Sequence, residues 1–130
     1  LTLLSHQGET ISLSELDGRP KVINTWASWC SFCKEELKNF ALLQEEFGDQ
    51  IQVIAINRAE SLKTANQFST ELSVEGRFLF LLDPEDSFYK SIDGFSMPET
   101  IFVDSSGKIK IHKRGFMEIE EMREKTNQII

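Results

Sequence analysis

Apolar and polar residues follow one another along the chain in blocks that predict alternating strands and helices. Two short apolar runs, Val22–Trp26 and Ile51–Ile56, have the continuous apolar character of strands that are covered on both faces. Between them, apolar side chains recur every three or four residues from about Cys30 to Phe47, which predicts an amphipathic helix ending at Gly48. Strand, helix and strand in this order favour parallel pairing of the two strands.

The second half of the chain continues this alternation. A second amphipathic helix is predicted from Leu62 onward, and Asp104–Gly107 is typical of a hairpin turn between two strands. The elements predicted for this half are a helix at about 62–72, a strand at 78–82, a short helix at 87–92, strands at 100–103 and 109–112, and a helix at about 118–129.

The N-terminal segment reads as an extension of the same domain. Leu1–Leu13 predicts two short strands around Gln7–Gly8, and Ser14 is expected to cap a brief helical turn. We therefore expect a single α/β domain over residues 1–130, in which residues 1–20 form an N-terminal β extension and a turn leading into the domain.

Charge and hydropathy argue against a nucleic-acid partner and against a membrane span within this chain. The 130 residues include 14 basic and 21 acidic ones, a net charge of -7, whereas phosphate binding depends on clustered Lys and Arg. We expect no nucleic-acid partner, and we expect the densest basic run, Lys108, Lys110, Lys113 and Arg114, to form a solvated strand face. No apolar stretch approaches the ~20 residues of a membrane span, and no signal peptide is visible at Leu1.

The two cysteines of the chain, Cys30 and Cys33, lie where the first apolar run gives way to the first helix. If the helix begins near Cys30, the two side chains lie one turn apart on the same face, close enough to form a disulfide. A bridge that closes so short a loop contributes little to fold stability, and a domain of this size needs no such staple. The pair is therefore predicted to be redox-active.

The two thiols are expected to differ in acidity. The start of a helix stabilises a thiolate through its unpaired backbone N–H groups and its dipole, so the pKa of Cys30 should be lowered. Lys34, on the same helix face, acts in the same direction, whereas Glu36, three residues after Cys33, is expected to raise the pKa of Cys33. We therefore expect Cys30 to be the nucleophile and Cys33 the resolving thiol.

A metal site is the alternative use of the two sulfurs. Zinc would require two further ligands, but the chain offers His6 and His112 without a matching spacing. His6 is expected to be an exposed turn residue, and His112 a strand residue that faces solvent. A copper carrier, with both thiolates as soft ligands, stays the alternative function, although no third ligand is evident.

Two segments together resemble the thioredoxin superfamily. They are Val22–Leu37, which contains Trp29–Cys33 with its Cys-x-x-Cys motif, and the later Met97–Asp104 with its proline. The resemblance covers nearly the whole chain from about Ile11. The chain resembles above all the TlpA/ResA-like branch of extracytoplasmic, often membrane-tethered thiol-disulfide oxidoreductases. It implies a thioredoxin-like three-layer sandwich: a central mixed β-sheet flanked by helices, with a short N-terminal β extension.

The resemblance also implies a substrate-binding surface. Pro98 should be a cis proline beside the cysteines, which leaves the backbone of Met97 free to pair with an extended client segment. Trp29, Phe32 and Met97 would form an apolar rim around Cys30, which suits the docking of an unfolded or extended partner.

One departure from ordinary thioredoxins concerns the proton of the resolving thiol. The position six residues before Cys30, where thioredoxins carry a buried Asp, is Asn24, which cannot accept a proton. In the TlpA/ResA-like branch a Glu just past the next strand fills this role, which implies that Glu60 is the base for Cys33, with a pKa raised by burial. The alternative is a surface Glu before the helix, with Ser61 as its cap.

The function implied by the resemblance is reduction of disulfides in extracytoplasmic client proteins, such as an apocytochrome c. It further implies a membrane thiol as electron donor, an anchor outside this chain, a monomer, and no cofactor beyond the Cys30–Cys33 disulfide. The direction of electron flow is not written in the motif, because 30 mV corresponds to only about 1.4 kcal/mol. A thiol peroxidase is a weaker alternative, since those enzymes resemble a Thr-x-x-Cys arrangement and this chain has a dithiol.

Overall fold

The computed structural model describes residues 2–16 and 18–130, so Leu1, where the first strand was expected to begin, lies outside the described residues. The strands are β1 (Thr2–Ser5), β2 (Thr10–Ser12), β3 (Lys21–Trp26), β4 (Gln52–Arg58), β5 (Leu79–Asp83), β6 (Glu99–Val103) and β7 (Ile109–Arg114). The helices are α1 (Ser31–Phe47), α2 (Leu62–Glu71), α3 (Ser87–Ser91) and α4 (Ile119–Asn127), with short 3₁₀ turns at Leu13–Glu15 and Gly48–Gln50.

The described strands form one mixed sheet in the order β2-β1-β5-β4-β3-β6-β7. The predicted parallel pairing is confirmed, because β3 is parallel to β4, and β4 is parallel to β5. The strands on either side of this parallel centre pair in the antiparallel sense: β6 with β3, β7 with β6, and β1 with β5. The sheet therefore has a parallel centre and antiparallel margins.

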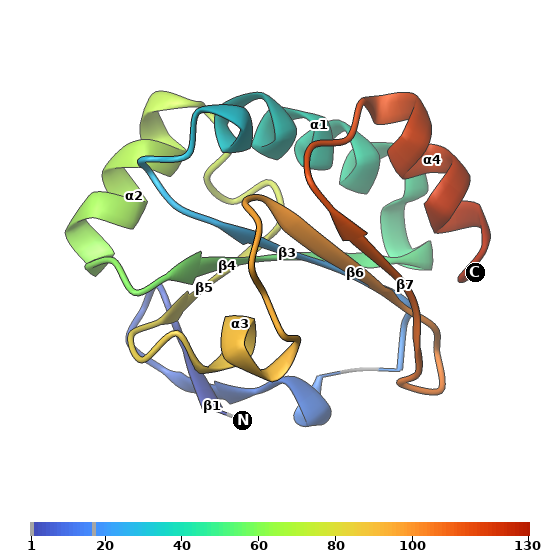
Figure 1. Ribbon diagram of the computed structural model, residues 1–130, viewed down its shortest axis with the longest axis horizontal. Helices are drawn as coiled ribbons and strands as arrows, with labels where there is room; N and C mark the ends of the chain where they lie inside the picture. Colours follow the sequence, from blue (N-terminus) through green and yellow to red (C-terminus); the bar gives the residue numbers. More distant parts are fainter. Residues whose placement is uncertain (1, 17) are drawn as a thin grey trace.

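Helices cover both faces of the sheet and make it the middle of three layers (Figure 1). Helices α1, α2 and α4 lie on one face, whereas α3 and the 3₁₀ turn at Leu13–Glu15 lie on the other. The alternation of side chains along β3 explains this division, because successive residues of a strand point to opposite faces. Val22 packs with Phe40 of α1, and Ile23 packs with Phe88 of α3.

The junction between β3 and α1 places the two cysteines. Cys30 occupies the N-cap position of α1 in an extended conformation, and its N–H donates to Ala27 O at 3.1 Å. At the other end, the helix stops at Gly48, which has a positive φ of 53°, a conformation that glycine adopts without steric cost. The helix predicted from the sequence is confirmed at both ends.

Several boundaries differ from the predictions by one or two residues, and two of these differences are informative. The first turn begins at Leu13 with Ser12 at its N-cap position, so Ser14 is not the cap; the chain leaves β2 directly into the turn. Strand β7 extends two residues past His112, because Lys113 and Arg114 continue the pairing with β6. That extension places Arg114 opposite Glu99, at the end of the sheet where β3 leads toward the cysteines.

His6 lies in a turn, as predicted, but its side chain is half-buried and not exposed. Its ring lies 5.6 Å from the ring of Phe80, between centroids, and burial lowers the pKa of the imidazole. In the part of the chain that is described, no helix is both long enough and apolar enough to cross a membrane.

Candidate functional site

Cys30 and Cys33 form a disulfide at the start of α1, with their Cα atoms 5.4 Å apart. Cys30 is 6% exposed and Cys33 is 1% exposed, so the first sulfur is the one that a partner reaches first. Trp26, directly upstream on β3, is fully buried and packs in the same apolar cluster as both cysteines. Both cysteines are buried, and Cys30 is the more exposed of the two.

The surroundings of Cys30 favour a thiolate. The first N–H groups of a helix have no partner within the helix, and Cys30 stands at that point of α1. Lys34 lines the same cavity of about 290 Å³ as Cys30, together with Ser28, Trp29, Ser31 and Phe68. Lys34 and Cys30 therefore share one cavity wall, as their common helix face predicts.

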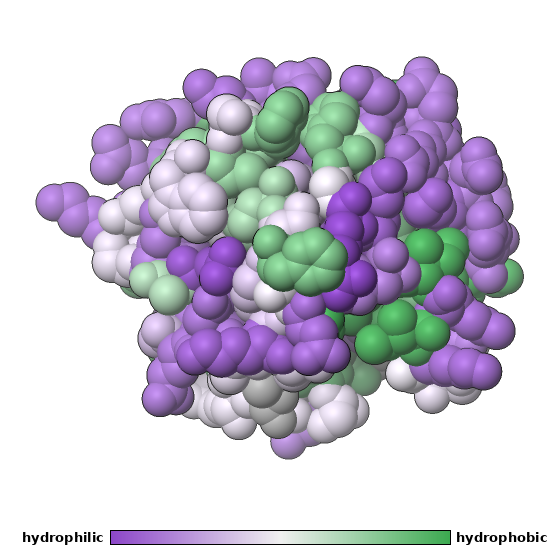
Figure 2. Space-filling view, in the orientation of Figure 1, coloured by the Kyte–Doolittle hydropathy of each residue, from purple (hydrophilic) through white to green (hydrophobic). Residues whose placement is uncertain are grey.

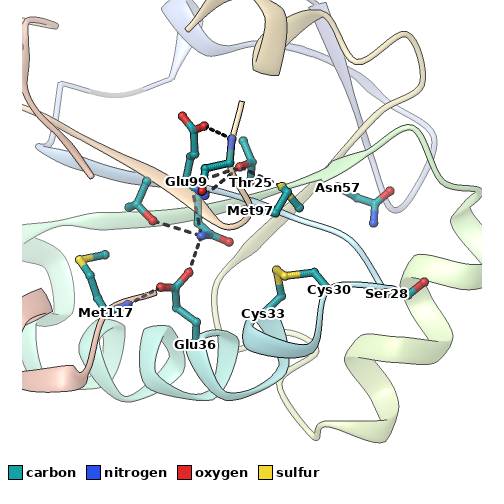
Figure 3. Close-up of a disulfide and its surroundings, with 12 residues drawn as sticks. Thr25, Ser28, Cys30, Cys33, Glu36, Asn57, Met97, Glu99 and Met117 are labelled. Atoms are coloured by element: carbon teal, nitrogen blue, oxygen red, sulfur yellow. Dashed lines mark hydrogen bonds between the residues drawn. A yellow bond between two sulfur atoms is a disulfide. The ribbon is translucent and has the colours of Figure 1, made fainter. Parts of the chain in front are cut away.

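Glu36 is the site residue whose role the sequence analysis missed. Its side chain is buried, and its Oε1 accepts a hydrogen bond from Asn24 Nδ2 at 2.9 Å while Oε2 accepts one from the backbone N–H of Met117 at 2.8 Å (Figure 3). Burial raises the pKa of this carboxyl to about 8, although both hydrogen bonds act to lower it. Glu36 is therefore mostly protonated at neutral pH, and the expectation of a fixed negative charge three residues after Cys33 is corrected.

A signal for this burial is present in the sequence. Glu36 lies within the apolar stripe of α1 that includes Cys33, Leu37 and Phe40, and that stripe faces the sheet. The position therefore indicates burial, whereas the partners of the carboxyl come from β3 and from the segment before α4.

Asn24 is a donor in this network, in agreement with its inability to accept a proton. Besides the bond to Glu36, its Nδ2 lies 3.1 Å from Thr100 Oγ1 and 3.4 Å from Glu99 O. The amide therefore joins α1 to β6 beneath the disulfide.

Glu60, the base implied by the resemblance, is bound to the turn before Trp29. Its Oε1 accepts from Ser28 N and from Asn57 Nδ2, both at 2.8 Å, and its Oε2 accepts from Ser28 Oγ at 2.5 Å. Ser61 also caps α2, accepting from Thr64 N at 3.2 Å, as the alternative interpretation held. In Figure 3, Ser28 and Glu36 lie on opposite sides of the disulfide. The role of Glu60 as base for Cys33 stays a prediction.

The loop before β6 brings Met97 and Pro98 to the cysteines. The peptide bond between them is cis, the conformation that the resemblance implies. Met97 packs against the apolar cluster that contains Cys30 and Cys33, and Figure 3 shows its side chain pointing into the same region as the disulfide.

Aromatic side chains surround this region at the surface. Trp29 is 65% exposed and Phe32 is 61% exposed. Two aromatic residues outside the predicted rim also stand out: the ring of Phe116 lies 6.0 Å from that of Phe32, and Phe95 is 76% exposed. Figure 2 shows apolar side chains grouped near the middle of this face, within a largely polar surround. Aromatic residues in loops carry no periodicity, so the sequence did not distinguish them from core residues.

Glu99, the residue after Pro98, is a second buried carboxyl of the site. Burial raises its pKa, but hydrogen bonds from the backbone N–H groups of Phe95 and Ser96 and from His112, together with Arg114, outweigh this and hold the pKa below its ordinary value. His112 was expected to face solvent, which is wrong: its Nε2 lies 2.6 Å from Glu99 Oε1.

The basic run of β7 is likewise only partly a solvated face. Arg114 Nε lies 3.4 Å from Glu99 Oε1, and Lys113 pairs with Glu121 at 3.0 Å.

Within residues 2–16 and 18–130, no group of three or more His, Cys, Asp or Glu side chains is placed to hold a metal ion. The two sulfurs thus lack a third ligand from these residue types.

Comparison with known proteins gives a family match over the whole chain. The profile of the Redoxin family matches residues 1–130. The thioredoxin-like protein YneN of Bacillus subtilis is 27% identical over 124 residues, which cover 95% of this chain and 73% of YneN. The thiol-disulfide oxidoreductase ResA of Bacillus subtilis is 29% identical over 103 residues, which cover 78% of this chain and 56% of ResA.

Solved structures agree with the architecture. The MTB protein DsbF, solved in mixed oxidized and reduced forms, superposes with a TM-score of 0.90 at 20% identity, covering 100% of this chain and 95% of DsbF. At that identity the likeness establishes the fold.

Proposed function

The chain belongs to the Redoxin family and is a thioredoxin-like thiol-disulfide oxidoreductase of the TlpA/ResA-like kind, and from that premise we propose that it reduces disulfides of client proteins outside the cytoplasm. The observation that supports this most directly is the Cys30–Cys33 disulfide at the start of α1, in which Cys30 is the more exposed sulfur and Cys33 packs in the apolar cluster that Met97 contacts.

The proposed reaction is two successive thiol-disulfide exchanges. The Cys30 thiolate attacks one sulfur of the client disulfide, forms a mixed disulfide, and releases the other client sulfur as a thiolate. The Cys33 thiolate then attacks Cys30, forms the Cys30–Cys33 disulfide, and releases the second client sulfur. Two electrons pass from the dithiol to the client, so a dithiol donor must reduce the protein again.

Cys33 must lose its proton before the second exchange, and two carboxyls are candidate bases. Glu60 is the base that the resemblance implies, although its oxygens already accept bonds from Ser28 and Asn57. Glu36 lies one turn after Cys33 on α1, and burial raises its pKa to about 8, close to the ~8.5 of an ordinary thiol. We favour Glu36 as the group that exchanges a proton with Cys33, with Glu60 holding the turn before Trp29.

A trapping experiment tests the roles of the two sulfurs. Cys33→Ala should accumulate a mixed disulfide with an oxidised client through Cys30, because no second thiol can release it. Mass spectrometry of the trapped adduct identifies the linked cysteine. If Cys30 of this variant stays unmodified while the wild-type protein reduces the same client, the assignment of nucleophile and resolving thiol is wrong.

The two carboxyls can be separated by the pH dependence of the second exchange. Glu36→Gln should slow release of the client from the mixed disulfide by about 100-fold, in the range for general acid–base catalysis, and should remove the inflection near pH 8. Glu60→Gln tests the base implied by the resemblance, and Glu35→Gln is the exposed control on the same helix. An unchanged profile in Glu36→Gln, together with a lost inflection in Glu60→Gln, would assign the proton transfer to Glu60.

Location and partners follow from the resemblance. We place the protein in the periplasm or at the outer face of the cell membrane, as a monomer with a membrane thiol as its donor and a secreted protein, such as an apocytochrome c, as its client. The redox-active disulfide is the only redox group that this proposal requires. The Cys30–Cys33 reduction potential, measured in glutathione or dithiothreitol buffers, tests the direction: a potential far above that of the glutathione couple would indicate net oxidation.

A copper carrier is the second candidate function, and one observation favours it. Met97, whose thioether is a soft ligand, packs against the apolar cluster that contains both cysteines. Titration of the reduced protein with Cu(I), beside an insulin-reduction assay, separates the two functions. Tight Cu(I) binding without exchange activity would replace the oxidoreductase proposal.

A further inference from the structure

Phe95 is the most exposed large apolar side chain of the described residues, at 76%, and it lies two residues before Met97. Scattered exposed apolar side chains are ordinary at protein surfaces, so exposure alone carries no argument. What distinguishes Phe95 is the number of contacts that fix its backbone and its ring.

The backbone of the loop around Phe95 is held on both sides. The N–H groups of Phe95 and Ser96 each donate to Glu99 Oε2 at 2.7 Å, and Ser96 O accepts from the Tyr89 hydroxyl at 2.6 Å. Beyond the proline, Pro98 O accepts from Gly115 N at 2.8 Å. Between these fixed points, the backbone N–H and C=O of Met97 make no hydrogen bond with any described residue.

The ring of Phe95 is held by a cation. The Arg114 guanidinium lies 4.3 Å from the ring centroid, a cation–π contact. Arg114 is itself fixed, because its Nε lies 3.4 Å from Glu99 Oε1 and its NH2 group donates to Asp93 O at 3.1 Å. Glu99 therefore orders both the backbone and the ring of Phe95 through its two oxygens.

Tyr89 supports the loop from α3. A Cβ on Gly94 would lie 2.4 Å from the Tyr89 ring, so only glycine allows the chain to pass this close. The Arg58 guanidinium lies 3.5 Å from the centroid of the Tyr89 ring, and two hydrogen bonds to Asp86, of 3.0 and 2.6 Å, hold it there. The loop is thus ordered without any contribution from a partner.

An ordered, exposed aromatic ring beside unpaired backbone groups has the properties of a binding anchor. Aromatic side chains dominate interface energetics, and a residue that is already ordered loses little entropy on binding. We propose that Phe95 is a second docking point for the client. The Phe95 ring contacts an apolar side chain of the client, while the backbone of Met97 pairs with the client backbone. Glu99 and Arg114 are positioning residues for this contact.

This inference rests on the proposed function and specifies its substrate class. The client is an extended, disulfide-bearing segment with an apolar side chain near the reactive cysteine. Specificity then depends on the residues that flank the client cysteine, in addition to the disulfide itself.

The test uses two disulfide-bonded peptides of otherwise identical sequence. One carries Leu, and the other Ser, at the positions two residues before and two residues after the reactive cysteine. Hydroxyethyl disulfide serves as a small substrate without flanking residues. Phe95→Ala should lower kcat/KM for the Leu peptide by about 5- to 30-fold, mainly through KM, and the loss should be at least fivefold larger than for hydroxyethyl disulfide. Phe95→Tyr should restore most of the activity. Ile109→Ala, 50% exposed at the far end of β7, is the matched control.

Arg114→Met tests the positioning role, because it removes the cation above the ring and leaves Phe95 in place. It should raise KM for the Leu peptide more than for the Ser peptide. Equal losses on both peptides in Phe95→Ala and Arg114→Met would overturn the inference while the oxidoreductase proposal stands. A wild-type protein that reduces neither peptide nor hydroxyethyl disulfide would instead overturn the proposed function.

Discussion

Glu36 and Glu99 are both enclosed carboxyls of the same site, yet their pKa values are shifted in opposite directions. Their exposures are 1% and 0%, but Glu36 lies deeper in the molecule than Glu99, so burial acts more strongly on its pKa. Glu36 accepts hydrogen bonds from one backbone N–H and one side-chain amide, and burial raises its pKa to about 8. Glu99 is buried as well, but two backbone N–H groups, His112 and Arg114 lower its pKa.

The comparison shows that depth of burial and hydrogen-bond partners together decide the charge of an enclosed carboxyl. Glu36, deeply buried and with neutral donors, keeps a proton near neutrality; it stands one turn from Cys33, whose proton must leave in the proposed reaction. Glu99, with a cation and two N–H groups as partners, stays ionised and binds the loop that carries Phe95 and Ser96. In our proposals the same residue type therefore serves proton transfer in one place and positioning in the other.

The largest expected effect concerns the pH dependence of stability in Glu36→Gln. The folded-state pKa of Glu36 lies above its ordinary value of 4.5. As pH rises, the carboxyl therefore ionises in the unfolded chain before it ionises in the folded protein. The wild type consequently loses stability between pH 4.5 and about pH 8. The variant lacks this loss, so its free energy of unfolding relative to wild type should rise by roughly 3 to 5 kcal/mol between pH 4 and pH 8. Urea unfolding of the oxidised proteins measures this. Parallel curves for both proteins would mean that Glu36 is ionised at neutral pH.

The second prediction reverses the sign for Glu99→Gln. At pH 7 the variant should be less stable than wild type by about 2 to 4 kcal/mol, because the buried charge that satisfies Arg114 and His112 is lost. The pKa of Glu99 is lowered, so its contribution is present above pH 4.5 and is lost as pH falls through the folded-state pKa. The difference between the proteins should therefore shrink in acid. A difference that stays constant down to pH 3 would contradict an ionised Glu99.

The smallest effect is expected for His112→Ala, which removes one partner of Glu99 and leaves Arg114 and the two backbone N–H groups. Destabilisation of about 1 kcal/mol is expected at pH 7, since this hydrogen bond is partly exposed. Lys110→Ala is the control on the same strand, because its pair with Asp104, at 4.0 Å, lies at the surface. If both variants unfold at the wild-type urea concentration, the imidazole contributes nothing to the charge on Glu99.

Much of the fold follows from local patterns in the sequence. The period of apolar residues predicts α1, the glycine at position 48 ends it, and Asp104–Gly107 predicts the β6–β7 hairpin. The two sulfurs of the site follow as well, because Cys30 and Cys33 need only one helix turn to meet. These features depend on residues that are close together in the chain.

The carboxyl networks could not be predicted because their partners are distant in sequence or depend on strand register. Met117 reaches Glu36 from 81 residues away. His112 and Arg114 reach Glu99 across a β6–β7 pairing whose register shifts between Phe102 and Val103. A shift of one residue moves side chains to the other face of a sheet, and the sequence pattern does not reveal where it occurs. The charge state of Glu36 was missed for the same reason.

The order of the strands has a consequence for how copies of this protein behave at high concentration. The outermost strands are β2, which has three residues, and β7, which carries Lys110, Lys113 and Arg114. A very short edge and a cationic edge both discourage sheet-to-sheet association, which is a route to amyloid-like aggregation. The protein can therefore expose aromatic side chains such as Phe95 while the edges of its own sheet stay protected from pairing with other copies.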